Sequence, residues 1–159
     1  MAKNIGEALT EIRVSKSELD RLLTARRNSF THRADEEVSP EEDYDALTKS
    51  IDKKMEDIRK LKIAVSKANL NKIVDTPEGT MPLAEAILLV GEYRSKLAMF
   101  QNLSEQFRDR RISFMSKDDV KTKQQKKMDF INNEIRNFEE RKARLDNFIQ
   151  AINWQVELK

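Results

Sequence analysis

A basic segment in the second half of the chain has the residue types that bind phosphate groups. Between Arg108 and Lys117 the sequence places three arginines, a lysine, two serines and a phenylalanine. Guanidinium groups make paired hydrogen bonds to phosphate oxygens, and the expected start of a helix just beyond adds N–H donors that favour anions. We therefore predict a site for a small anionic ligand in this segment, with these contacts: Arg108, Arg110, Arg111 and Ser113.

A second arginine pair, Arg26 and Arg27, is predicted to join this site. An antiparallel helical bundle places its first and third connections at the same end, which brings this pair near the basic segment. The alternative is that the arginines are neutralised by an acidic stretch. That stretch comprises Asp35, Glu36, Glu37, Glu41, Glu42, Asp43 and Asp45.

Three further residues are candidates because of their positions near the C-terminus. Lys142 interrupts an apolar stripe, where it can set register, reach toward water or aim a cation into a cavity. Asn153 and Trp154 form a pair that either anchors the chain end or holds a planar ligand. All three belong to the predicted ligand contacts.

Several classes of chemistry are excluded by residue counts. The chain has no cysteine, and His32 is its only histidine. Zinc sites built from cysteine and histidine, and di-iron sites that need two Glu-x-x-His motifs, cannot form. The three glycines are isolated, so no glycine-rich phosphate loop is present. We predict a protein that is not an enzyme and has no metal or cofactor.

Composition predicts long helices. Charged residues make up 36% of the chain, whereas glycine and proline occur three times each. The 30 basic and 28 acidic residues are interleaved and leave a net charge of only +2. This pattern is typical of solvated helix faces, and it disfavours nucleic-acid binding.

Four helices are predicted from capping residues and apolar spacing, about 4–27, 40–68, 81–109 and 117–157. The start signals are Asn4 with Glu7, Ser39 before Pro40, Thr80, and Ser116. Residues 76–80 are predicted to form a turn. The apolar stripes of the first three helices are expected to include Leu9, Met55 and Ile87. The fold class is therefore all-α, an antiparallel four-helix bundle with coiled-coil packing.

The last helix carries the most regular apolar stripe. Its members alternate in steps of three and four: Met128, Ile131, Ile135, Phe138, Lys142, Leu145, Ile149, Ile152 and Val156. Such spacing predicts packing against partner helices. Because this helix is expected to outrun its neighbours, its final turns need apolar cover, and we predict a homo-oligomer.

The location of the protein is predicted from the apolar runs that it lacks. No run approaches the ~20 residues that span a bilayer. The N-terminal residues lack the apolar stretch of a signal peptide. We expect no membrane partner and a cytoplasmic protein, in a bacterium or an infected host cell.

Several short segments resemble the septicolysin-like family of small all-helical bacterial and phage proteins. They are Ala68–Leu70, Leu83–Ile87, Ile112–Phe114, Asp119–Val120 and Ile149–Leu158. The resemblance implies a helical oligomer without an established reaction, and it adds Asn69 to the candidate ligand contacts. Ser66 stands where the family pattern has asparagine.

Together these features predict a non-enzymatic, oligomeric binding protein for a small anionic, nucleotide-derived ligand. One such role is a phage sponge that sequesters a host immune signalling nucleotide. The alternative is a structural or adaptor coiled-coil protein that pairs through its last helix and has no small-molecule ligand.

Overall fold

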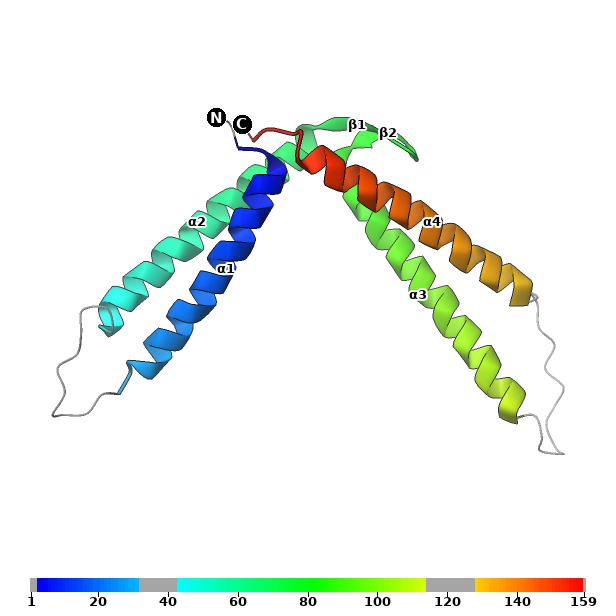
Figure 1. Ribbon diagram of the computed structural model, residues 1–159, viewed down its shortest axis with the longest axis horizontal. Coiled ribbons are helices and arrows are strands. Elements are labelled where there is room, and N and C mark those ends of the chain that lie inside the picture. The colour runs from blue at the N-terminus through cyan, green and yellow to red at the C-terminus, as the bar shows by residue number, and fades with distance from the viewer. Residues whose placement is uncertain (1–2, 32–42, 114–127, 159) are drawn as a thin grey trace. The chain divides into compact units, whose positions relative to one another are not determined.

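The computed structural model describes residues 3–31, 43–113 and 128–158, with only the backbone of residues 107–113. The elements are α1 (Ile5–Asn28), α2 (Tyr44–Asn71), β1 (Ile73–Thr76), β2 (Gly79–Pro82), α3 (Leu83–Ser113) and α4 (Met128–Asn153), drawn in Figure 1. The prediction of a mainly helical protein is confirmed. The chain forms two compact units: residues 1–72 with 152–159, and residues 73–151. We call them the first and second units.

The first unit is a helical hairpin in which α1 packs against α2. The inward residues of α1 alternate in steps of three and four, as do those of α2, which is the spacing of a coiled-coil seam. On α1 they are Ile5, Ala8, Ile12, Ser15, Leu19, Leu22 and Arg26, and on α2 Leu47, Ile51, Lys54, Ile58, Leu61, Val65 and Ala68. Lys54 Nζ lies 2.6 Å from Glu18 Oε2 of the facing helix.

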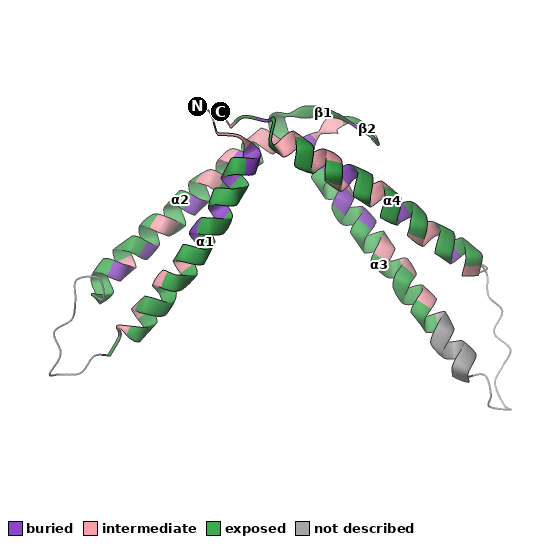
Figure 2. Cartoon of the chain, viewed as in Figure 1, coloured by how far each residue is buried: buried purple, intermediate pink, exposed green. Residues whose placement is uncertain are grey.

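The second unit contains the β-hairpin and a second helical pair, α3 and α4. Its core joins Ala86, Val90 and Tyr93 of α3 to Phe138 and Leu145 of α4. The Phe138 ring lies 5.8 Å from that of Tyr93. Figure 2 shows buried residues recurring along one side of each helix, as the period of an amphipathic helix requires.

The predicted stripe of the last helix is confirmed from Met128 to Ile152, because every member is buried or half-buried. The predicted end of that helix at residue 157 is wrong. α4 stops at Asn153, and the following residues pair with the N-terminus. The N–H of Ile5 donates to Val156 O at 2.9 Å, and that of Leu158 donates to Lys3 O at 2.8 Å. Val156 is therefore buried beyond the helix rather than on it.

A short antiparallel β-hairpin was not predicted from the sequence. β1 and β2 pair with Val74 opposite Met81 and Thr76 opposite Gly79. The predicted turn at 76–80 is present, and Gly79 has φ +122°, which favours a residue without a Cβ. Thr80 does not cap α3, since it lies in β2 and donates to Asp75 Oδ1 at 2.6 Å.

The predicted start of α1 is confirmed, whereas the start of α2 and the end of α3 differ from the predictions. The Asn4–Glu7 capping box is present, with Glu7 N donating to Asn4 Oδ1 at 2.8 Å. α2 begins at Tyr44 with Asp43 as its cap, and Ser39 and Pro40 lie outside the described residues. α3 continues to Ser113, because residues 108–113 contain no helix breaker and arginine favours helices. The predicted start at Ser116 also lies outside the described ranges.

Three corrections concern which apolar residues face inward. Leu9 and Met55 were expected in the stripes, but they are 43% and 53% exposed. The fully buried Ala8 takes the inward position on α1 instead. On α3, Ala86 likewise replaces Ile87.

Within the described ranges, no helix is both long and apolar enough to cross a lipid bilayer.

Candidate functional site

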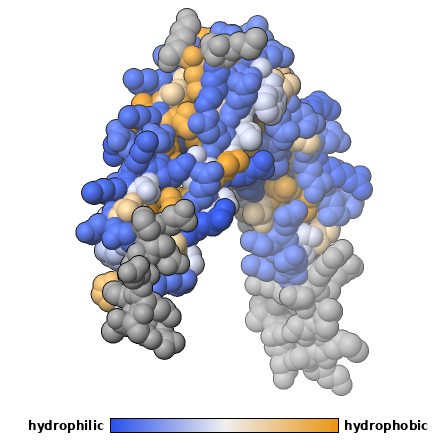
Figure 3. All heavy atoms as spheres, turned by 60° about the vertical axis from the view of Figure 1, so that its left-hand side comes forward, coloured by the Kyte–Doolittle hydropathy of each residue, from blue (hydrophilic) through white to orange (hydrophobic). Residues whose placement is uncertain are grey.

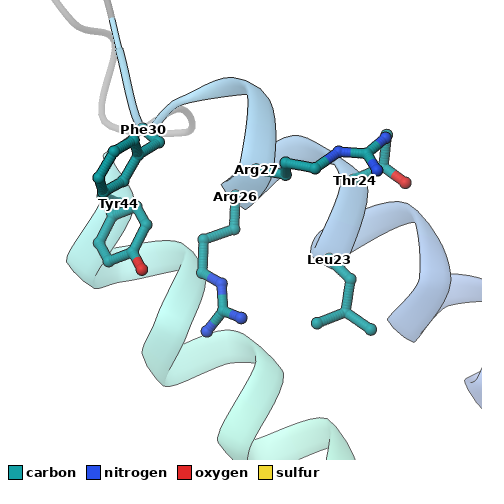
Figure 4. Close-up of a pocket in the computed structure, with 6 residues that line it drawn as sticks. All are labelled: Leu23, Thr24, Arg26, Arg27, Phe30 and Tyr44. Atoms are coloured by element: carbon teal, nitrogen blue, oxygen red, sulfur yellow. The ribbon is translucent and has the colours of Figure 1, made fainter.

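The strongest candidate site is a pocket where α1 ends and α2 begins. It has a volume of about 490 Å³ and is shown in Figure 4. We call it the arginine–aromatic pocket. Its lining residues are Leu23, Thr24, Arg26, Arg27, Phe30 and Tyr44. The predicted candidates Arg26 and Arg27 therefore lie together in one site.

The geometry of the pocket combines a cation with two rings. The Phe30 and Tyr44 rings meet edge to face, with centroids 6.0 Å apart. The Arg26 guanidinium lies 5.8 Å from the centre of the Tyr44 ring, within the range of a cation–π contact. Figure 4 shows Arg26 extending toward α2, whereas Arg27 and Thr24 lie together on the other side. Arg26 is thus the cation beside the rings, and Arg27 lies at the rim.

The cation and one ring are available to a ligand. Phe30 is 74% exposed, the highest value among the large apolar side chains of the described residues. Among the described residues, no carboxylate forms an ion pair with either arginine of the pocket. Asp43, one of the acids weighed as their partner, instead accepts a hydrogen bond from Ala46 N at 2.7 Å. The remaining acids at 35–42 lie outside the described ranges.

The other predicted arginines cannot be placed in this pocket. Arg108, Arg110, Arg111 and Ser113 belong to the last turns of α3, where only the backbone is described. Lys142 belongs to the second unit and lies 2.6 Å from Asp146 Oδ2, one turn along α4. Its ammonium group therefore forms an ion pair with a carboxylate of the same helix.

Asn69, Asn153 and Trp154 lie in the first unit but at the other end of its hairpin. Trp154 covers Gly6 near the start of α1 and is 59% exposed. The side-chain Oδ1 atoms of both asparagines are buried without a hydrogen-bond partner among the described residues. Because a helix rises by about 1.5 Å per residue, Gly6 and Arg26 are about 30 Å apart. One small ligand cannot contact both ends.

A polar cluster in the second unit was missed from the sequence. Arg141 of α4 binds both carboxylate oxygens of Glu78, at the tip of the β-hairpin. Tyr93 of α3 donates its hydroxyl to Glu78 Oε2 at 2.8 Å, and its ring lies 4.7 Å from the Arg141 guanidinium. The three side chains are hydrogen-bond partners of one another, so the cluster links the turn of the β-hairpin to α3 and α4. The signal is weak in the sequence because the three residues are far apart along the chain.

The cluster shifts the pKa values of its members in opposite directions. The hydrogen bond from Arg141 lowers the pKa of Glu78 below its ordinary value. Burial, followed by the hydrogen bond to Glu78, raises the pKa of Tyr93 to about 12. A lowered carboxyl pKa stabilises the fold above about pH 4.5, and this stability is lost as the pH falls. The raised Tyr93 pKa means that stability is lost as the pH rises above 10.

We predict that Glu78→Gln lowers stability at neutral pH and that its effect shrinks in acid. Arg141 is 38% exposed, so the loss is discounted to about 1 kcal/mol. Melting temperatures of both proteins between pH 7 and pH 3 should converge as the pH falls, because protonation removes the same interaction from the wild type. Glu139→Gln, at an exposed position on α4, is the control. A difference that stays constant with pH would show that the ion pair adds no stability.

A known protein family and a solved structure match this chain. A protein-family model, described as a family of unknown function (DUF6847), matches residues 7–158. The chain belongs to DUF6847. No curated protein matches the chain. A solved structure, a functionally unknown conserved protein from Corynebacterium diphtheriae, has 19% identity and a TM-score of 0.80 with 100% of both chains covered.

Membership in DUF6847 corrects the family resemblance drawn from the sequence. The septicolysin-like interpretation is wrong, because a different family model matches nearly the whole chain. The segments that suggested it are only two to ten residues long, which is too short to distinguish one helical family from another. The Corynebacterium protein supports the fold of this DUF6847 chain, and at 19% identity it supports nothing further.

Proposed function

We propose that this DUF6847 protein is a binding protein for a phosphorylated aromatic ligand, of which a nucleotide is the simplest example. The observation that carries the proposal is the arginine–aromatic pocket. It holds the Arg26 guanidinium within 5.8 Å of one ring and leaves a second ring, Phe30, exposed. A guanidinium matches phosphate oxygens and an exposed ring provides a stacking surface for a base.

The lining also supports binding rather than catalysis. Among the described residues of the pocket there is no carboxylate or imidazole to act as a general base. The Thr24 hydroxyl donates to the backbone carbonyl of Asp20 at 3.0 Å, and neither this hydroxyl nor that of Tyr44 has a described basic side chain that would activate it for attack. Retention of an intact ligand is therefore the proposed role. Sequestration of a signalling nucleotide by a phage-encoded protein stays a prediction from the sequence.

Homo-oligomerisation also stays a prediction. Its basis is the apolar stripe of the last helix, and α4 packs Phe138, Leu145 and Ile149 of that stripe against α3 within the chain. The alternative adaptor function relied on the same stripe, so it loses the surface through which pairing was expected. The binding proposal does not depend on this stripe.

Arg26→Ala should weaken binding of ADP at least tenfold. A hydrogen bond to a charged group contributes about 1.5–3 kcal/mol, and 1.4 kcal/mol is already tenfold in affinity. Titration calorimetry with ADP measures the effect. Arg13→Ala removes an exposed arginine of α1 that does not line the pocket, so it should bind ADP like the wild type. Equal affinities of all three proteins would remove the pocket from consideration.

Phe30→Ala separates the stacking contribution from the phosphate contribution. Base stacking on an aromatic side chain is worth about 1–3 kcal/mol per base, so ADP affinity should fall about five- to hundredfold. Binding of inorganic phosphate should stay unchanged, whereas Arg26→Ala should weaken both probes. Because Phe30 is 74% exposed, its removal should leave the melting temperature nearly unaltered. A parallel loss of phosphate binding in Phe30→Ala would contradict the assigned roles.

A further inference from the structure

The first unit exposes an apolar groove that the ligand proposal does not use. It runs along α2 beside α1 and has a volume of about 480 Å³. The apolar residues that line it are Leu19, Met55, Ile58, Ile63 and Leu70. Met55, Ile63 and Leu70 are 53%, 49% and 64% exposed, so no described part of the chain covers them. In Figure 3, orange patches interrupt the hydrophilic surface of the unit that comes forward.

The rim of this groove is basic. Its charged lining residues are Lys16, Arg59, Lys62 and Lys67. No carboxylate lines the groove among the described residues, although acidic side chains are frequent elsewhere in the chain. The ion pairs of α2 that the structure describes use other lysines, Lys54 and Lys60. The groove therefore offers apolar contact area between positive charges that form no ion pair among the described residues, which favours an acidic occupant.

The length of the groove fits a short helix. From Met55 to Leu70 the helix rises by about 22 Å, which equals roughly four turns of a partner helix. Amphipathic helices bind grooves of this kind by placing apolar residues from successive turns into them. An exposed apolar surface with a polar rim is typical of a protein interaction site.

Charge disfavours the other occupants. Two copies paired through the same groove would place Lys62 and Lys67 against the same lysines of the other copy, and like charges across an interface are unfavourable. An anionic membrane matches the charge, but it is a flat surface, and a groove enclosing about 480 Å³ is concave. We propose that this groove, the lysine-rimmed groove, binds an acidic amphipathic helix of a partner protein.

A pair of synthetic peptides tests the proposal on the full chain. The acidic probe is an 18-residue helix with leucines on one face and glutamates flanking them, and the basic probe carries lysines in place of the glutamates. Fluorescence anisotropy should show the acidic peptide binding at least tenfold more tightly, with an affinity that falls as salt is added. Failure of the acidic peptide to bind, or equal binding of both peptides, overturns the proposal.

A charge-reversed variant gives the sharper result. Lys62→Glu with Lys67→Glu should abolish the preference, so that the two peptides bind with similar affinity, because the two glutamates balance the charges of Lys16 and Arg59. Lys49→Glu with Lys53→Glu changes exposed lysines of α2 outside the groove, and it should bind like the wild type. An unchanged preference in the groove variant overturns the proposal, even if the acidic peptide binds.

Two further measurements distinguish the competing occupants. The first is binding to phosphatidylcholine–phosphatidylserine vesicles. If the wild type binds these vesicles but not the acidic peptide, and the groove variant does not bind the vesicles, the groove is a membrane-binding site and the proposal is overturned. The second is analytical ultracentrifugation. If the wild type sediments as a dimer and Ile63→Glu sediments as a monomer, the groove binds a second copy of the chain and the proposal is likewise overturned. Ile63 is 49% exposed, so this substitution should not unfold the hairpin. A monomer that binds only the acidic peptide supports the partner helix.

Discussion

Leu145→Asp should unfold the second unit. Leu145 is fully buried and packs in the cluster that joins α3 to α4. Truncating a buried leucine to alanine costs about 2–5 kcal/mol, and an unpaired buried carboxylate adds a desolvation penalty. Because small domains are stable by only about 5–15 kcal/mol, we expect loss of α3 and α4. Circular dichroism should then lose roughly half of the helical signal, since these helices hold 31 and 26 residues.

The matched control is Leu88→Asp on α3. It makes the same chemical change at a position that is 69% exposed, so the carboxylate stays in water. Its helical signal and melting temperature should stay close to those of the wild type. If both variants melt at the same temperature, the packing of α3 against α4 is not what holds the second unit together.

Gly6→Ala should displace the only tryptophan of the chain. A Cβ at position 6 would lie 2.7 Å from Trp154 Cδ2, which is closer than such atoms approach. Because Trp154 is 59% exposed, the indole can move into water. We expect a red shift in tryptophan emission, stronger quenching by acrylamide, and a stability loss of about 1–3 kcal/mol.

Gly91→Ala provides a control with the opposite sign. Gly91 lies in α3, and a Cβ there would have no atom within 4 Å. Replacing a helical glycine by alanine stabilises a helix by about 0.5–1 kcal/mol, so the melting temperature should rise. Tryptophan emission should not change. Emission that also stays unchanged in Gly6→Ala would show that the indole does not rest on position 6.

The sequence predicted helices and seams better than their partners. Spacing in α4 identified the inward face from Met128 to Ile152, since an amphipathic period depends only on local sequence. It could not tell whether α3 or another copy covers that face. Small residues caused the errors in α1 and α3, because a buried alanine such as Ala8 carries a weaker hydrophobic signal than the neighbouring, exposed Leu9.

The sequence contains a local signal for the β-hairpin, although the hairpin was not predicted. β1 has the sequence Ile-Val-Asp-Thr, with three β-branched residues just before the predicted turn. The end of α4 at Asn153 is harder to predict, because the residues after it pair with the other end of the chain, Glu157 with Asn4. Long-range pairing of this kind leaves no local pattern in the sequence.

The candidate site was partly predictable. Arginine chemistry identified Arg26 and Arg27, which line the pocket. Phe30 and Tyr44 were missed as ligand contacts because they lie on either side of the connection between α1 and α2. Only the hairpin geometry brings the two rings to 6.0 Å.

An NMR titration with ADP tests the central claim most directly. The amide resonances of residues 23–30 and of Tyr44 should shift together and saturate with a single affinity, while those of residues 4–7 and 152–156 stay in place. Such shifts would place a phosphorylated aromatic ligand in the arginine–aromatic pocket. Saturable shifts at Trp154 and its surroundings, or no shifts at any amide, would contradict the account.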